Sequence, residues 1–380
     1  LFFSAYVPNS LGGTNWESFP SEQDLGVSGL VSPDFNQVYD PAALMILEGK
    51  GFADRDGNLT AYVGPGYSFF LAMVYSINGP DLNLVRLIQI FLDSLIAVMI
   101  FFLAKKIYST RIGVLSGLLY SLYPLAIYQS VLLLTDGLFT FLLAVYMSLS
   151  VHFLLKLERK HLVKTSFFIS GVVLGLASLV RPNGMVMIAS IVLFVLFTSA
   201  ENRRQLSIAI FYTGIGFALS LSPWIVRNYY VFDQFIPVSS IVFHTFEESE
   251  GEIQKNLTEY FVKRISRLFQ NTSEVAGSFF TRPFTVWFST SSGRLDILVA
   301  IIQLPILIIA IFGSFVRAQN NNLKIFMILN IIIFVVALLL VSKNALARYI
   351  VPIMPFVLIL LATKLEYFLF KLRLLKGEHE

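Results

Sequence analysis

Long apolar stretches recur along the chain of 380 residues and are separated by short polar segments. About 20 apolar residues suffice for a helix to cross a bilayer. We therefore predict nine transmembrane helices, with cores at residues 87–104, 112–130, 137–155, 166–180, 185–200, 208–226, 297–316, 325–341 and 349–370. The first residues, LFFSAYVPNS, have the composition of a helix end, so we expect a tenth, truncated helix before Leu1.

The basic residues gather in every second connection between these predicted helices. Cytoplasmic loops carry an excess of Lys and Arg, so these connections are predicted to face the cytoplasm. They hold Lys105, Lys106, Arg111, Lys156, Arg159, Lys160, Lys164, Arg203, Arg204, Arg317, Lys324, Lys371, Arg373 and Lys376. The remaining connections then face outward, namely 1–86, the turn before Asp136, 181–184, 227–296 and 342–348.

Residues 1–376 are predicted to form a single transmembrane domain. Its parts are a first outer loop at 1–86, helices at 87–228, an outer loop at 229–296 and C-terminal helices at 297–370. Within the first loop, PAALMILEGKGF predicts a short amphipathic helix that ends at Gly49, because Gly favours helix C-termini. The segment PGYSFFLAMVYSI is apolar but too short to span, so we expect it to lie in the membrane interface.

The composition agrees with an all-α polytopic membrane protein. The mean hydropathy is +0.72, and 14% of the residues are charged, against about 25% in soluble domains. The net charge of +4 is explained by the basic connections, so it does not indicate nucleic-acid binding. The chain has no Cys, which excludes a disulfide framework and thiolate metal sites.

Two carboxylates on the predicted outer side, Asp34 and Asp136, are candidates for chemistry. Asp34 and Asp40 lie in SPDFNQVYDPAAL, ahead of the first short helix, and Asp136 stands in LTDGLF at the outer start of its helix. A carboxylate near the bilayer surface can act as a general base toward a substrate at the head-group level. The alternative is that these residues are turn and N-cap residues, which the helix dipole favours.

Three arginines are predicted at the same outer membrane level. Arg181 lies in SLVRPNG, Arg227 in SPWIVRNYY, and Arg348 in ALARYIVPIMP. The positive-inside rule disfavours such positions, so they need a reason. Binding a phosphate is one, because the guanidinium group can hold phosphate with two hydrogen bonds. The alternative is that each side chain reaches toward lipid phosphates without a specific ligand.

Two further features carry weaker signals. Asp93 lies within a predicted span and can be either a buried structural partner or a cavity residue. His244 and Glu247, in HTFEE, are weak candidates for a cation site, with a solvated loop as the alternative.

The order of these motifs resembles the GT-C membrane glycosyltransferases, specifically the protein O-mannosyltransferase and lipid A aminoarabinose-transferase group. The resemblance rests on PDFNQVYDPAALMILEGKGF, GPGYSFFLA, the stretch from NLVRLIQIF to LTDGLFTFLL, LASLVRPNG, SPWIVRNYYVFDQFIPVSS and ARYIVPIMP. It covers most of the chain. It implies a GT-C-like bundle of nine or ten transmembrane helices with interfacial helices in the first outer loop.

The resemblance also implies a reaction. An inverting glycosyltransferase would move a sugar from a polyprenyl-phosphate donor to a protein, lipid or glycan acceptor. Asp34 would be the base and Asp136 a second carboxylate of the cavity. Arg181, Arg227, Arg348, Tyr39 and Tyr67 would bind substrate. Because the leaving phosphate departs as an anion, this chemistry needs cations and requires no cofactor, although a divalent cation remains an option.

The resemblance and the predicted topology imply an integral protein of the plasma (inner) membrane with its site facing outward. Two other functions stay open. A transporter or flippase should have broken helices and charges at the midplane of the membrane. A polysaccharide ligase or polymerase would use the late outer loop at 227–296, which holds several Arg residues and His244.

Overall fold

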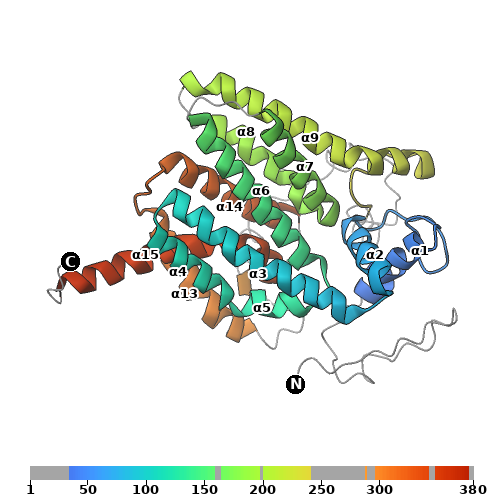
Figure 1. Ribbon diagram of the computed structural model, residues 1–380, viewed down its shortest axis with the longest axis horizontal. Coiled ribbons are helices and arrows are strands. Elements are labelled where there is room, and N and C mark those ends of the chain that lie inside the picture. The colour runs from blue at the N-terminus through green and yellow to red at the C-terminus, as the bar shows by residue number, and fades with distance from the viewer. Residues whose placement is uncertain are drawn as a thin grey trace, which may run out of the picture.

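The computed structural model describes residues 34–158, 164–196, 200–240, 287–288, 296–341 and 347–375. Every regular element in these ranges is a helix, apart from an isolated bridge between Ala53 and Leu59. The predicted all-helical fold class is therefore confirmed. Figure 1 shows the helices as one bundle with α1 and α2 at one end and the C-terminus of α15 at the other.

The predicted first outer loop, whose described part we call the first outer segment, is a compact unit of short helices. It comprises the π-helix η2 (Phe35–Tyr39), α1 (Asp40–Leu47) and α2 (Gly66–Asn78). Gly64 and Gly66 flank Pro65 and pack against the backbone of Leu179 and Val180, so closely that a Cβ atom at either glycine would clash. The motif GPG therefore docks the start of α2 onto the end of a distant helix.

The next helices are α3 (Leu82–Ile107), α4 (Thr110–Ser121), α5 (Pro124–Val131) and α6 (Thr135–Glu158). The carboxylate of Asp81 caps α3 by accepting from the backbone N–H groups of Asn83 and Leu84. The predicted apolar core at 112–130 falls on two helices, because α4 and α5 meet at a bend of 53°. Pro124 explains the break, since proline has no N–H to continue α4 and is well suited to begin α5.

A glycine seam joins α7 (Lys164–Val180) to α9 (Ala200–Phe232), with η3 (Pro182–Met187) and α8 (Ile188–Leu196) between them in sequence. A Cβ atom at Gly171 would clash with the carbonyl of Thr213, and one at Gly216 would clash with that of Phe168. Small residues at such positions let helix backbones approach closely in a membrane.

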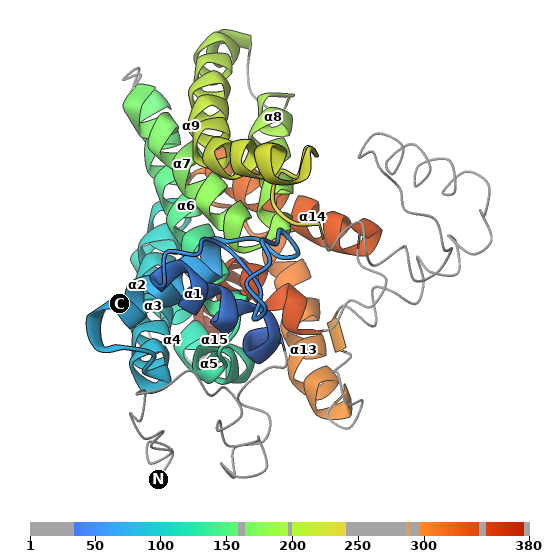
Figure 2. The ribbon, with the colours of Figure 1, turned by 90° about the vertical axis from the view of Figure 1, so that its right-hand side faces the viewer.

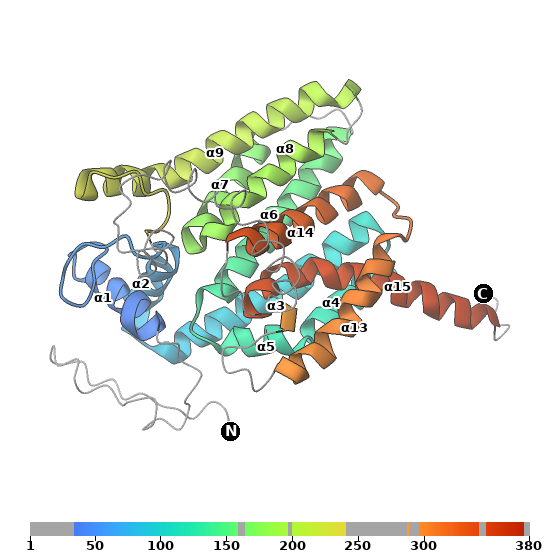
Figure 3. The ribbon, with the colours of Figure 1, turned by 180° about the vertical axis from the view of Figure 1, so that it is seen from behind.

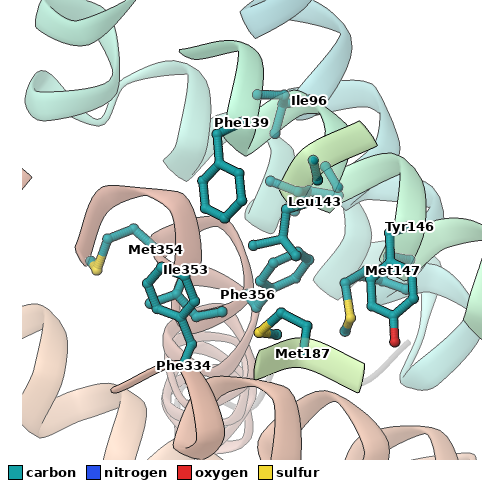
Figure 4. Packing of buried hydrophobic residues seen from close by; sticks show 14 of the residues in the cluster. Ile96, Phe139, Leu143, Tyr146, Met147, Met187, Phe334, Ile353, Met354 and Phe356 are labelled. Carbon is teal, nitrogen blue, oxygen red and sulfur yellow. The ribbon is translucent and has the colours of Figure 1, made fainter. Parts of the chain in front are cut away.

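The C-terminal part consists of α13 (Asp296–Ser314), α14 (Asn321–Val341), η4 (Ala347–Ile353) and α15 (Met354–Leu375). The main core lies where α6 faces η4, α14 and the start of α15. Figure 4 shows Phe139 and Leu143 of α6 beside Phe334, Ile353 and Phe356. In α6 and in α15, 61% of the apolar stretch that could span the membrane is buried, against 22% in α13. Helices α6 and α15 are therefore the central helices.

Each of the nine predicted apolar cores overlaps helical structure. Six helices are long and apolar enough to cross a membrane, and the α4–α5 pair can form a seventh span. Two shorter apolar helices, Lys164–Val180 and Pro182–Phe194, complete the set in the described part of the chain. The positions of the apolar helices are thus as expected, whereas the number of membrane crossings stays a prediction.

The two ends of the bundle differ in charge. At one end Lys106 of α3 contacts His152 of α6, with Nζ and Nδ1 3.2 Å apart, and the backbone N–H of Asn320 donates to the carbonyl of Ile107. The basic connections after α3 and α6 and before α14 therefore meet there. Figures 2 and 3 show α1 and α2 gathered at the other end.

Candidate functional site

Two arginines meet at one aromatic ring beside the first outer segment. Arg181 follows α7 and Arg348 lies in η4, and the guanidinium carbon of each is 5.0 Å from the ring centre of Tyr349. Nη2 of Arg348 also donates to the hydroxyl of Tyr349 over 3.2 Å. The negative face of an aromatic ring attracts cations, so Tyr349 stabilises two positive charges close together.

Each of these arginines faces one of the predicted carboxylates. Arg181 forms an ion pair with Asp136, and these side chains are only 13% and 4% exposed. Nη2 of Arg348 is 3.9 Å from Oδ2 of Asp34, and these side chains are 34% and 61% exposed. The first pair is enclosed and in direct contact, whereas the second is open and longer. We call Asp34, Asp136, Arg181, Arg348 and Tyr349 the charged cluster.

Tyr39 lies at the charged cluster and keeps its hydroxyl proton at neutral pH, so its hydroxyl can donate a hydrogen bond. Burial raises the pKa of Tyr39 to about 12, against the opposing influence of Arg181 and with a further contribution from Asp34. Its hydroxyl also lies near the side chain of Thr135, directly before Asp136, and this neighbour lowers the pKa of Tyr39 slightly. Tyr39 therefore adds a hydroxyl to the group of charged side chains.

Tyr67 lies behind Tyr39, away from the charged side chains. The two rings pack edge to face with their centres 5.3 Å apart. Tyr67 is fully buried, and its hydroxyl donates to Oε1 of Gln89 over 2.7 Å. Tyr67 therefore packs against Tyr39 in this structure, and its predicted substrate contact stays a prediction.

The first outer segment fixes the position of Asp34. Asp34 directly precedes the π-helix η2, a rare element that is often found at functional sites. The hydroxyl of Ser68 donates to the carbonyl of Tyr39 over 3.0 Å, and that of Tyr75 donates to Oδ1 of Asp40 over 2.7 Å. Both bonds tie η2 and α1 to α2, so Asp34 projects from a fastened helix start.

Asp136 and Arg181 are also positioned by helix ends. Asp136 lies in the first turn of α6, where the helix dipole favours a carboxylate. Arg181 adopts an extended backbone between α7 and η3, directly after the residues that the glycines of GPG contact. The docking of the first outer segment therefore brings Asp34 and Arg181 to the same place.

Arg227 shares none of these contacts. Its Nη1 donates to the carbonyl of Thr60 over 2.7 Å, and its Nη2 donates to that of Phe52 over 2.9 Å. Its guanidinium carbon lies 4.9 Å from the ring of Trp224 and 5.2 Å from that of Phe232. Arg227 thus fastens the first outer segment to the end of α9, and we call this arrangement the Arg227 clasp.

Two other predicted sites stand apart. His244 and Glu247 lie outside the described residues, so the structure does not bear on the suggested cation site. Among the residues that are described, no group of three or more His, Asp or Glu side chains could hold a metal. Asp93 accepts a 2.6 Å hydrogen bond from the hydroxyl of Tyr120, next to the break between α4 and α5.

Sequence reasoning missed Thr135, Tyr349 and two buried glutamines near the charged cluster. Gln89 donates to the carbonyl of Leu132 over 2.7 Å, and Gln129 donates to that of Arg348 over 3.0 Å. A signal existed for the glutamines, since an amide in an apolar stretch must find hydrogen-bond partners when it is buried. For Tyr349 the signal was its place directly after Arg348.

Comparisons with known proteins found one family model and several solved structures that are similar to this chain. Residues 62–226 match the family model for dolichyl-phosphate-mannose-protein mannosyltransferase. This range contains Asp136 and Arg181, but Asp34 and Arg348 lie outside it. A comparison with curated proteins gave no match.

Solved structures share the fold over most of the chain. The oligosaccharyltransferase AglB from Archaeoglobus fulgidus, in complex with an inhibitory peptide and a dolichol-phosphate, is 14% identical with a TM-score of 0.59. The alignment covers 90% of this chain and 48% of AglB. ArnT from Cupriavidus metallidurans, bound to undecaprenyl phosphate, is 16% identical with a TM-score of 0.60, and 89% of this chain covers 56% of ArnT.

The chain thus spans about half the length of these structural relatives, and at such low identity the likeness shows the fold alone. The resemblance inferred from the sequence is confirmed. The chain shares the GT-C fold of AglB and ArnT, and its residues 62–226 match the protein mannosyltransferase family model.

Proposed function

We propose that this chain is an inverting glycosyltransferase that moves a sugar from a polyprenyl-phosphate-linked donor to an acceptor at the outer face of the membrane. The observation that carries the proposal is the charged cluster, in which two Asp–Arg pairs share one tyrosine ring. The dolichol-phosphate and undecaprenyl phosphate bound by AglB and ArnT support a lipid phosphate as the ligand.

Arg348 is the side chain best placed to receive the donor phosphate. The two carboxylates and two guanidinium groups of the cluster carry no net charge together, so an anionic phosphate must compete with a carboxylate for an arginine. The Arg348–Asp34 contact of 3.9 Å is long and partly exposed, whereas Arg181 is enclosed with Asp136. Separating the enclosed pair would leave a buried charge without compensation, which is the more costly choice.

When the phosphate replaces Asp34 as the partner of Arg348, the carboxylate of Asp34 becomes available to the acceptor. In the transfer step, the acceptor oxygen forms a bond to the anomeric carbon while the bond from that carbon to the phosphate oxygen breaks. The acceptor proton passes to the carboxylate of Asp34, and the electron pair leaves with the phosphate. A single displacement of this kind inverts the anomeric configuration. The leaving phosphate gains negative charge, which Arg348 stabilises.

Asp136 and Arg181 have a supporting role in this mechanism. Asp136 holds Arg181 in place, and Arg181 contacts the ring of Tyr349 from its position after α7. The positive potential of Arg181 then acts on a phosphate at Arg348 without releasing Asp136.

We further propose that residues 1–376 form one domain of the inner membrane with the charged cluster facing outward. The basic connections at the opposite end of the bundle support this orientation, because such residues are retained in the cytoplasm. Protein, lipid and glycan acceptors all carry hydroxyl or amide groups that Asp34 can serve, so the acceptor class stays open.

One observation favours a second candidate function. The broken α4–α5 helix, with the Asp93–Tyr120 hydrogen bond beside it, has features of a transport path through the membrane. In a lipid flippase, Asp93 would be essential and Asp34 would be dispensable. The glycosyltransferase proposal expects the reverse.

Two matched variants separate these functions in proteoliposomes supplied with polyprenyl-phosphate sugars and an extract of acceptors. Asp34→Asn is expected to reduce sugar transfer by about 10²- to 10⁴-fold, the usual contribution of a general base. Asp93→Asn is expected to retain transfer. The proposal fails if Asp34→Asn is folded and transfers sugar normally, or if the linkage formed keeps the donor's anomeric configuration.

A further inference from the structure

A buried amide contacts the backbone of the residue that we assign to the donor phosphate. Gln129 lies in α5, the second half of the broken helix, and is 6% exposed. Its Nε2 donates to the carbonyl oxygen of Arg348, 219 residues away in sequence, over 3.0 Å. A buried amide is costly without hydrogen bonds, so this bond constrains both ends.

The sequence of η4 explains why this carbonyl can accept a donor from elsewhere. In an α-helix the carbonyl of Arg348 would accept from the N–H of residue 352, which is a proline and has no N–H. The segment forms a 3₁₀-helix instead, in which this carbonyl pairs with the N–H of residue 351 and keeps a lone pair for another donor. Gln129 supplies that second donor.

The hydrogen bond from Gln129 matters because the side chains of Arg348 and Tyr349 extend from the same stretch of backbone. Arg348 contacts Asp34 and the Tyr349 hydroxyl through its guanidinium, and the Tyr349 ring also faces Arg181. A shift of the backbone at Arg348 would therefore move two members of the charged cluster at once.

A second glutamine anchors the chain directly after α5. Gln89 donates to the carbonyl of Leu132, in the short link between α5 and α6, and accepts from the buried hydroxyl of Tyr67. The two glutamines thus fix the C-terminal end of α5, relative to α3 through Gln89 and relative to η4 through Gln129. The link leads directly to Thr135 and Asp136. Helix α5 therefore connects the enclosed Arg181–Asp136 pair to the open Arg348–Asp34 pair.

We infer that Gln129 is a positioning residue, which holds the Arg348–Tyr349 backbone so that Arg348 meets the donor phosphate. Gln129 does not contact the reacting groups, and it acts through Arg348. This inference rests on the proposed function for its kinetic consequence, whereas its structural consequence can be measured without any substrate.

The test uses Gln129→Met, which keeps the size and flexibility of the side chain but removes the donor. In nanodiscs, amide hydrogen exchange of residues 347–353 is expected to become about 2- to 10-fold faster, as the loss of one hydrogen bond would give. Gln303→Met is the matched control, because Gln303 is fully buried and its amide has no hydrogen-bond partner in the described structure. It should leave exchange in 347–353 unchanged.

The kinetic arm measures transfer at varied concentrations of polyprenyl-phosphate sugar. Gln129→Met is expected to lower kcat/KM for the donor by about 10- to 100-fold, the effect of a small misplacement, while KM for the acceptor is retained. In the background Arg348→Ala, Gln129→Met should add little further loss, because both act on the same interaction.

The outcomes separate the inference from the proposed function. Unchanged exchange in 347–353 overturns the inference, whatever the substrate is. Equal losses for donor and acceptor, or fully additive losses with Arg348→Ala, also overturn it, because they indicate general damage. Faster exchange supports the positioning role even if polyprenyl-phosphate sugars are not turned over, in which case the proposed function alone fails.

Discussion

The charged cluster and the Arg227 clasp contain arginines that the sequence presents as equivalent, yet their surroundings differ. In the cluster, Arg348 faces a carboxylate at 3.9 Å and is 34% exposed on its side chain. In the clasp, Arg227 donates to two backbone carbonyls of the first outer segment and packs against two aromatic rings. An arginine satisfied by backbone carbonyls is part of the framework, whereas one that faces an exposed carboxylate can exchange partners.

This contrast shows how the protein assembles its site. The clasp, the docking glycines Gly64 and Gly66, and the seam at Gly171 join the first outer segment, α7 and α9. That assembly carries Asp34 and Arg181. Arg348 and Tyr349 arrive from η4, at the far end of the sequence. The site therefore forms only when both parts of the chain are packed together.

The largest expected effect comes from removing the side chain of Arg348, the arginine that can exchange its carboxylate partner for a phosphate. Arg348→Ala should lower kcat/KM for a polyprenyl-phosphate sugar by about 10²- to 10³-fold, the cost of losing one group that stabilises developing negative charge. Thermal unfolding should change little, because the side chain is partly exposed. Transfer assays with purified protein check this expectation. Normal turnover by Arg348→Ala would show that Arg348 is not needed at the site, so that its role would not differ from that of Arg227.

A smaller effect on activity and a larger one on stability are expected at the clasp. Arg227→Met removes one hydrogen-bond donor from each of the carbonyls of Phe52 and Thr60, which should cost about 1–3 kcal/mol. The fraction that remains folded should transfer sugar within roughly tenfold of the native protein, since rigid placement and not phosphate contact is lost. Thermal unfolding in nanodiscs measures the first effect.

The exposed Arg203, on α9 at the basic end, supplies the control for that experiment. Arg203→Met removes the same charge and should leave the unfolding temperature within the scatter of the native protein. If Arg227→Met unfolds normally but loses transfer as fully as Arg348→Ala, then Arg227 binds substrate after all.

The smallest effect concerns Asp40, a carboxyl held for packing close to the site. Burial raises the pKa of Asp40, although its hydrogen bond from Tyr75 and the charge of Arg55 oppose the shift. The folded state therefore favours the protonated form. This contribution is present below the unfolded pKa and is lost as pH rises through the folded pKa.

Asp40→Asn keeps an acceptor for Tyr75 and removes the titration. At pH 7 it should be as stable as the native protein or more stable, by on the order of 1 kcal/mol. The advantage should shrink as the pH is lowered toward 4. Unfolding temperatures across this range check the sign, and a growing advantage at low pH would contradict the assignment of burial as the cause.

Hydropathy predicted the positions of the apolar helices because bilayer thickness and helix rise are fixed quantities. The alternation of basic connections also placed Asp34, Asp136, Arg181 and Arg348 on one side, and the structure brings these four together. The bend between α4 and α5 was missed, because Pro124 reads as one residue within an apolar stretch. A prediction from the length of apolar stretches does not detect one missing backbone N–H group.

The roles of individual polar residues were harder to predict for a different reason. Arg227, Tyr67 and Gln129 all satisfy hydrogen-bond partners that are remote in sequence, such as the Arg348 carbonyl 219 residues from Gln129. Local patterns carry no information on which distant backbone group will lack a donor. The partner of Gln129 depends on the 3₁₀ geometry of η4, which is a tertiary outcome.

The zero net charge of the four ionised side chains in the cluster has a consequence for encounter with substrate. A soluble enzyme for anionic substrates often gathers them from solution through a long-range positive field. Balanced charges produce no such field, and salt screens what remains within about 10 Å. Under the proposed function, a substrate carried on a lipid would not need such a field, since it would diffuse in two dimensions within the membrane. The cluster is thus suited to recognise an anion at contact, and the membrane would supply the delivery.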